Sequence, residues 1–204
     1  MLSFEFTESF KDFKKLQYVT FSQLQILKFP YEVPKLELLN NFLEINGKTL
    51  REFYLNRNIL LPNLVSFTKF CPNLRRLSIE LENNKLEALK TIFNNCQFLE
   101  SIKIWYEDKF MNERDMLEVV VKYSPKSFHE FGFSCDNLRI VLLPEELESI
   151  LISWSNRIPL KPLSLFIDKP SSSNISLYEE ENIENVQIFE KYVELGIVKK
   201  FELF

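Results

Sequence analysis

The feature that most constrains this chain is a spacing of apolar residues that recurs from end to end. Three apolar positions follow the pattern apolar-x-x-apolar-x-apolar, for example at Leu24, Leu27 and Phe29. Copies begin near residues 1, 24, 50, 74, 99, 128, 160 and 198. One match means little in a chain that is 46% apolar, but the regular spacing indicates internal repeats of one structural unit.

Each interval between copies holds a segment with helical periodicity. Leu36, Leu39 and Leu43 fall at positions i, i+3 and i+7, which places them on one face of a helix. Gly47 and Gly196 follow two such segments, where a helix C-terminus favours glycine. We therefore predict a unit of one strand and one helix. The fold class is α/β, with an inner parallel sheet of about eight strands and outer helices.

Two copies carry a more specific signature. The segments Cys-Pro-Asn-Leu-Arg-Arg-Leu-Ser-Ile at 71–79 and Asn-Cys-Gln-Phe-Leu-Glu-Ser-Ile-Lys-Ile at 95–104 both place a cysteine three residues before the first strand leucine. They resemble cysteine-containing leucine-rich repeats (LRRs) of the ribonuclease-inhibitor-like kind. Together with the closing run 193–201, they make the chain similar to the LRR half of fungal-type F-box/LRR proteins.

This resemblance implies a single horseshoe-shaped solenoid domain over 1–204, with a loop insertion at 168–182 that contains the acidic run 179–181. It also implies the substrate-receptor part of an SCF-type E3 ubiquitin ligase, which binds a target protein on its concave face. No F-box is visible, so Skp1 and cullin are expected as partners only through a missing F-box. The alternative is a free-standing LRR scaffold or inhibitor without a ubiquitin link.

The segment 143–151 resembles the opening of an F-box helix, but its position between two strand patterns favours a repeat helix. Both ends of the chain lack recognisable caps, because Met1 lies within a strand pattern and Phe204 ends one. We expect a fragment, a product shortened relative to its family, or a chain capped by short segments.

Composition excludes several functional classes. The net charge of −4 gives no general attraction to nucleic acid or to an anionic membrane. Three glycines argue against Gly-rich phosphate loops, and a single histidine, His129, excludes multi-histidine metal sites. We predict no enzyme activity, cofactor or metal. Without a signal peptide or a membrane-spanning stretch, we expect a cytoplasmic or nuclear protein, in which Cys71 and Cys96 pack as small apolar side chains.

The candidate site is the sheet face that points away from the predicted core. Tyr54 lies in the middle outward slot of its strand, and Trp105 and Phe166 share the slot after the last core position. Large rings in a polar setting are typical interface anchors. Arg76 and Lys103, beside Glu52 and Glu80, supply charge complementarity. The predicted protein-binding residues are Tyr54, Arg76, Lys103, Trp105 and Phe166.

Overall fold

The structure, a computed structural model, describes residues 2–6, 13–57, 59, 64–81, 85–106, 113–135, 142–168 and 183–203. Eight parallel strands form one sheet in which spatial order follows chain order. They are β1 (Leu2–Glu5), β2 (Leu24–Phe29), β3 (Glu52–Leu55), β4 (Arg76–Glu80), β5 (Ser101–Tyr106), β6 (Glu130–Cys135), β7 (Leu163–Asp168) and β8 (Val198–Leu203). The prediction of an α/β fold with about eight parallel strands is confirmed.

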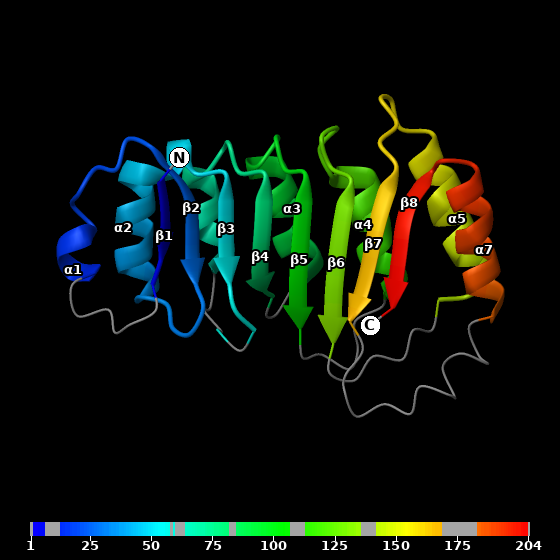
Figure 1. The fold of residues 1–204 in the computed structure, drawn as a ribbon, viewed down its shortest axis with the longest axis horizontal. Helices are drawn as coiled ribbons and strands as arrows, with labels where there is room; N and C mark the ends of the chain where they lie inside the picture. Colours follow the sequence, from blue (N-terminus) through cyan, green and yellow to red (C-terminus); the bar gives the residue numbers. More distant parts are fainter. Residues whose placement is uncertain are drawn as a thin grey trace.

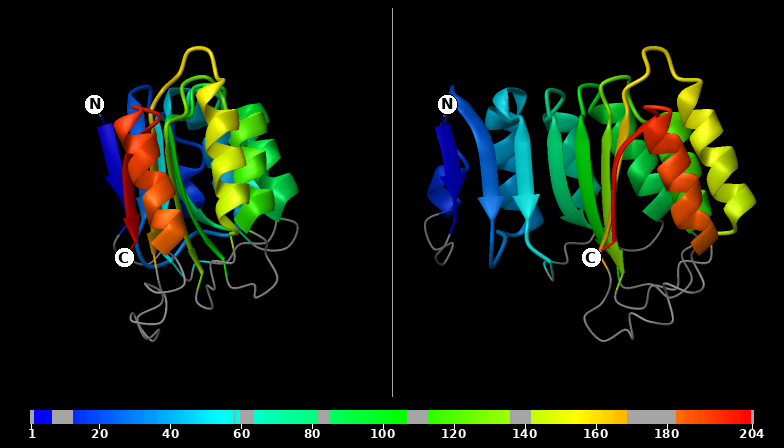
Figure 2. Two further views of the ribbon diagram at one scale, coloured as in Figure 1. Left: turned by 90° about the vertical axis from the view of Figure 1, so that its right-hand side faces the viewer. Right: turned by 45° about the vertical axis from the view of Figure 1, so that its right-hand side comes forward.

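The helices form a second layer against one face of this sheet (Figures 1 and 2). They are α1 (Phe13–Leu16), α2 (Leu36–Asn46), α3 (Lys85–Asn95), α4 (Glu113–Tyr123), α5 (Pro144–Ser155) and α7 (Ile183–Glu194), with the 3-10 helices η2 (Gly47–Thr49) and η3 (Leu64–Phe70). Within the described ranges, no helix combines the length and apolarity that a bilayer crossing requires.

The opposite side of the sheet is termed the open face, and three rows of side chains cross it. The N-terminal row is Ser3, Ile26, Glu52, Arg76, Ser101, Glu130, Ser164 and Lys200. The central row is Glu5, Lys28, Tyr54, Ser78, Lys103, Gly132, Phe166 and Glu202. The C-terminal row includes Glu80, Trp105 and Ser134.

The same turn precedes five of the strands and accounts for the first apolar position of the repeated pattern. The first apolar N–H of the pattern donates to the carbonyl three residues earlier, as from Leu74 to Cys71 at 3.2 Å and from Leu99 to Cys96 at 3.1 Å. The same bond joins Leu24 to Phe21, Leu50 to Gly47 and Phe128 to Pro125. Cys71 and Cys96 are fully buried, as the sequence predicts.

The predicted register of the seventh repeat is wrong by two residues. Leu160 is 40% exposed and precedes β7, whereas Leu165 lies opposite Phe131 and Ile167 opposite Phe133. The strand begins only after Pro162, which has no N–H to donate to a ladder, and its alternate residues from 163 onward fill the core. Phe166 therefore lies in the central row and not in the row of Trp105. Residues 169–182, with most of the predicted loop insertion and its acidic run, lie outside the described residues, as does Phe204.

The two glycines predicted to end helices have different roles. Gly196 has a φ of 70° and its N–H donates to Val193 O. This is the left-handed backbone conformation in which glycine commonly ends a right-handed helix. Gly47 keeps a right-handed helical φ of −68°. A Cβ there would lie 2.6 Å from Phe70 O, so close approach of the next repeat requires this glycine.

Candidate functional site

The first cluster on the open face joins β3 and β4. The Tyr54 hydroxyl donates a 2.8 Å hydrogen bond to Glu52 Oε2. The other Glu52 oxygen, Oε1, lies 3.9 Å from Arg76 Nη1, which comes from the adjacent strand in register. The Lys28 ammonium lies 5.6 Å from the centre of the Tyr54 ring. Glu52 therefore orients both a ring and a guanidinium toward the same part of the face.

Burial has a measurable chemical consequence for Tyr54. Partial burial of the ring, together with the hydrogen bond and the negative charge of Glu52, raises the pKa of Tyr54 to about 12. The hydroxyl is therefore a fixed hydrogen-bond donor at neutral pH. Such a ring presents apolar area with its polar end already oriented, which suits an interface anchor.

The second cluster lies on β5 and extends over β6. Lys103 Nζ is 5.7 Å from the centre of the Trp105 ring, within the range of a cation–π contact. A Cβ on Gly132 would lie 3.3 Å from Lys103 Cγ, so the lysine stem leans across the glycine. Across β3 to β7 the central row therefore alternates large and small side chains: Tyr54, Ser78, Lys103, Gly132 and Phe166.

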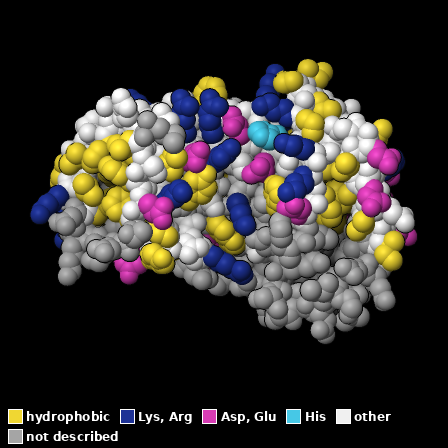
Figure 3. All heavy atoms as spheres, in the orientation of Figure 1, with side chains coloured by type: hydrophobic (Ala, Val, Ile, Leu, Met, Phe, Trp, Pro, Cys, Tyr) yellow, Lys and Arg dark blue, Asp and Glu magenta, His cyan; other side chains and the backbone are white. Residues whose placement is uncertain are grey.

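Phe166 belongs to a third cluster, two strands away from Lys103. Lys200 Nζ lies 5.6 Å from the centre of the Phe166 ring and forms an ion pair with Glu202. All five predicted residues lie on the open face, but in three groups. Tyr54 and Arg76 meet through Glu52, Lys103 and Trp105 meet directly, and Phe166 stands apart. Figure 3 shows acidic, basic and apolar side chains interspersed on this face.

Several residues of the face differ from what their sequence slots suggest. Glu80 is only 8% exposed, so its carboxylate does not supply the surface charge that we predicted. Glu130 accepts a 2.7 Å hydrogen bond from Ser101 Oγ and contributes a carboxylate that the predicted site omits. Lys28 and Lys200, each beside a ring, were also missed. The strand alternation places both lysines on the open face, but it does not show which ring on a neighbouring strand each lysine contacts.

The described side chains include the single histidine and two of the three cysteines. They contain no set of three His, Cys, Asp or Glu side chains able to hold a metal ion. His129 Nδ1 lies 2.9 Å from the Ser127 carbonyl oxygen. Burial raises the pKa of the Cys96 thiol to about 12 and that of Cys71 well above its ordinary value. These two thiols are therefore poor nucleophiles at neutral pH.

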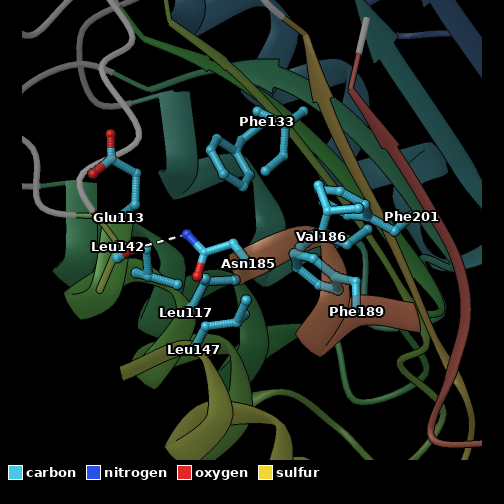
Figure 4. Close-up of a pocket in the computed structure, with 11 residues that line it drawn as sticks. Glu113, Leu117, Phe133, Leu142, Leu147, Asn185, Val186, Phe189 and Phe201 are labelled. Atoms are coloured by element: carbon cyan, nitrogen blue, oxygen red, sulfur yellow. Dashed lines mark hydrogen bonds between the residues drawn. The ribbon is translucent and has the colours of Figure 1, made fainter. Parts of the chain in front are cut away.

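A small cavity lies where the helices pack against β6, β7 and β8 (Figure 4). Its volume is about 30 Å³ and its walls are mostly apolar, with Leu117, Phe189 and Phe201 among them. This volume is far below that of small-molecule sites, which is roughly 300 Å³ or more. Asn185 of α7 donates a 2.9 Å hydrogen bond to Leu142 O, which joins α7 to the segment that leads into α5.

No protein-family model matches the sequence, and no curated protein matches it either.

Proposed function

We propose that the chain is a non-catalytic protein-recognition module that binds a target protein on its open face. The observation that carries the proposal is the central row, where Tyr54, Lys103 and Phe166 alternate with the small residues Ser78 and Gly132. An open hollow lies beside Tyr54 and Ser78 on this face, whereas the Lys103 stem leans across Gly132. Aromatic and arginine side chains in such settings supply most of the binding energy in protein interfaces.

The dimensions of the face suit a protein partner. Eight strands about 4.8 Å apart span roughly 34 Å. The N-terminal and central rows of side chains cover that length, and the C-terminal row adds Glu80, Trp105 and Ser134. Fixed charges such as Arg76 with Glu52 and Lys200 with Glu202 would select the partner more than they strengthen its binding.

We propose further that the fold is a leucine-rich-repeat solenoid and that the module is the substrate-receptor part of an SCF-type ubiquitin ligase. The recurrent turn, the buried Cys71 and Cys96 and the chain-order parallel sheet support the repeat class. The ligase role rests on the sequence resemblance alone. A free-standing scaffold or inhibitor on the same repeats is the alternative.

Affinity capture from cell extract tests both levels of the proposal. Tagged wild-type chain is compared with Tyr54→Ala/Trp105→Ala and with the control Tyr18→Ala/Tyr31→Ala, whose tyrosines are exposed and lie outside the three rows. We expect a target that the control retains and the first variant loses. With the purified target, loss of two anchors should weaken binding by about tenfold or more. Equal capture by all three chains would refute these anchors.

The identity of the captured proteins separates the two roles. Recovery of Skp1 and cullin with the target supports a ligase receptor. A target recovered without them supports a scaffold or inhibitor. Circular dichroism of each variant checks that the fold is retained.

A further inference from the structure

A second surface lies at the edge of the sheet where the strands begin. An open hollow of about 510 Å³ lies among the turns that precede β2 to β5. We call it the rim hollow, and its lining is Ser22, Gln23, Gln25, Lys48, Thr49, Arg51, Asn73, Arg75 and Phe98. This edge is the upper margin of the sheet in Figure 1. It is distinct from the three rows of the open face.

The charge of the rim hollow is opposite to that of the chain. Its lining has three cations, five neutral hydrogen-bonding residues and one ring, and it includes no carboxylate. The whole chain, in contrast, has 29 acidic and 25 basic residues. Figure 3 shows Lys and Arg side chains gathered above β3 and β4 at this margin. The hollow is therefore a local positive site on an acidic protein.

Two of the three cations are available to a ligand. Among the described residues, Lys48 and Arg51 have no ion-pair partner. Arg75 Nη1 lies 2.8 Å from Glu100 Oε1, a bond that holds the guanidinium at the edge of the hollow. The guanidinium has further N–H donors besides the one in this bond.

The backbone fixes the spacing of these charges. Arg51 N–H donates to Gln25 O at 2.8 Å, and Arg75 N–H donates to Arg51 O at 2.7 Å. Arg51 and Arg75 thus occupy equivalent positions of neighbouring repeats, about one strand spacing of 4.8 Å apart. The Asn73 side chain also donates a 2.8 Å hydrogen bond to Lys48 O, which ties the two turns together. A ligand would meet a ladder of cations whose attachment points are rigid.

We propose that the rim hollow binds an extended acidic peptide segment of a partner protein. Successive carboxylates of such a segment can cross the strand starts and meet Arg51 and Arg75 in turn, with Lys48 beside them. Gln23 and Gln25 can bond the peptide backbone, and the exposed ring of Phe98 offers an apolar contact at one end. Three cations in a net acidic chain favour a short acidic peptide over a long polyanion such as nucleic acid.

Fluorescence anisotropy with a labelled octaglutamate peptide and the full chain tests this site. Lys48→Glu/Arg51→Glu should weaken binding by about tenfold or more, because two attractive contacts become repulsive. The control Lys14→Glu/Lys35→Glu changes the net charge by the same amount at exposed residues outside the hollow. Its affinity should stay within about twofold of wild type, and raising the ionic strength from about 0.05 to 0.5 M should weaken wild-type binding.

Three outcomes would overturn the proposal. Equal loss in the control would mean that net charge, and not the hollow, attracts the peptide. Complete displacement by orthophosphate at about the peptide's own concentration would mean a small-anion site, because a single phosphate would then compete as well as a chain of eight carboxylates. Binding of an octauridine RNA in place of the peptide would mean a nucleic-acid site. Tyr54→Ala/Trp105→Ala should leave peptide binding unchanged, so this test is independent of the open face.

Discussion

At the scale of single residues, Tyr54 gives the open face its clearest chemical signature. Its pKa of about 12 results first from burial and then from Glu52. In an alkaline titration followed by phenolate absorbance, the difference between wild type and Tyr54→Phe should appear near pH 12 and not near 10. Glu52→Gln should lower this pKa part of the way, because burial remains. A difference that titrates at the ordinary value would contradict the geometry.

The same shift links Tyr54 to stability. The folded state holds the phenol proton more tightly than the unfolded chain, so the unfolded state binds fewer protons between pH 10 and about 12. The stabilisation from Tyr54 is therefore fully present below pH 10 and is lost as the pH rises through 12. Tyr54→Phe should show a shallower decline of unfolding free energy over this interval, measured by urea denaturation at a series of pH values.

The sequence predicts the row of a residue better than it predicts the residue's contacts. Tyr54 and Trp105 occupy their predicted slots because strand periodicity is fixed by the backbone. The hydrogen bond from Tyr54 to Glu52 depends on rotamers and was not predictable. The sequence also could not show why residue 47 is glycine. The carbonyl oxygen of Phe70, 23 residues later in the chain, approaches it too closely for a side chain.

At the scale of elements, Arg157 fastens the turn after α5 to the end of α4. Its guanidinium donates to Val121 O, Ser124 Oγ, Ser124 O and Pro125 O at 2.6–3.2 Å, and it stacks 4.2 Å from the Trp154 ring centre. Arg157→Met keeps the stem but removes these donors. We expect a loss of about 2 to 4 kcal/mol in unfolding free energy, measured by urea denaturation, because half-buried carbonyls lose their partners.

Arg114 provides the matched comparison. It is exposed and pairs with Glu118 and Glu146 on the surface of α4 and α5. Arg114→Met should lower the unfolding free energy much less than Arg157→Met does, because exposed ion pairs stabilise weakly. Equal effects of the two substitutions would mean that the Arg157 network does not hold the repeats together.

Element boundaries show where periodicity is insufficient. Leu160, Leu163 and Leu165 match the apolar pattern, but Leu163, Leu165 and Ile167 also alternate as a strand requires. The pairing of β7 with β6 fixes the register in which Leu163, Leu165 and Ile167 face the core. This register depends on both strands, so the pattern of one strand alone does not determine it. Similarly, the interval between β3 and β4 holds the 3-10 helix η3, although each interval was predicted to form a helix with a regular apolar stripe.

At the scale of the whole molecule, the chain-order sheet makes stability depend on position. Among the described residues, each inner strand has two strand neighbours, whereas β1 and β8 have one each. Repeat arrays of this kind are stabilised mainly by contacts between adjacent units. The ends should therefore open at lower free energy than the centre.

Hydrogen exchange followed by mass spectrometry measures this gradient directly. We expect peptides of β1 to exchange first, because its four residues pair only with β2 and its Phe4 and Phe6 are only half-buried. Peptides of β8, backed by the stacked rings of Phe189 and Phe201, should follow. Peptides of β5, paired on both sides, should exchange last. Exchange of all eight strands at one rate would mean that coupling between adjacent repeats is strong enough for the sheet to open as one cooperative unit. In that case a substitution such as Arg157→Met would accelerate exchange in β1 as much as in β7, whereas weaker coupling confines its effect to β6, β7 and β8.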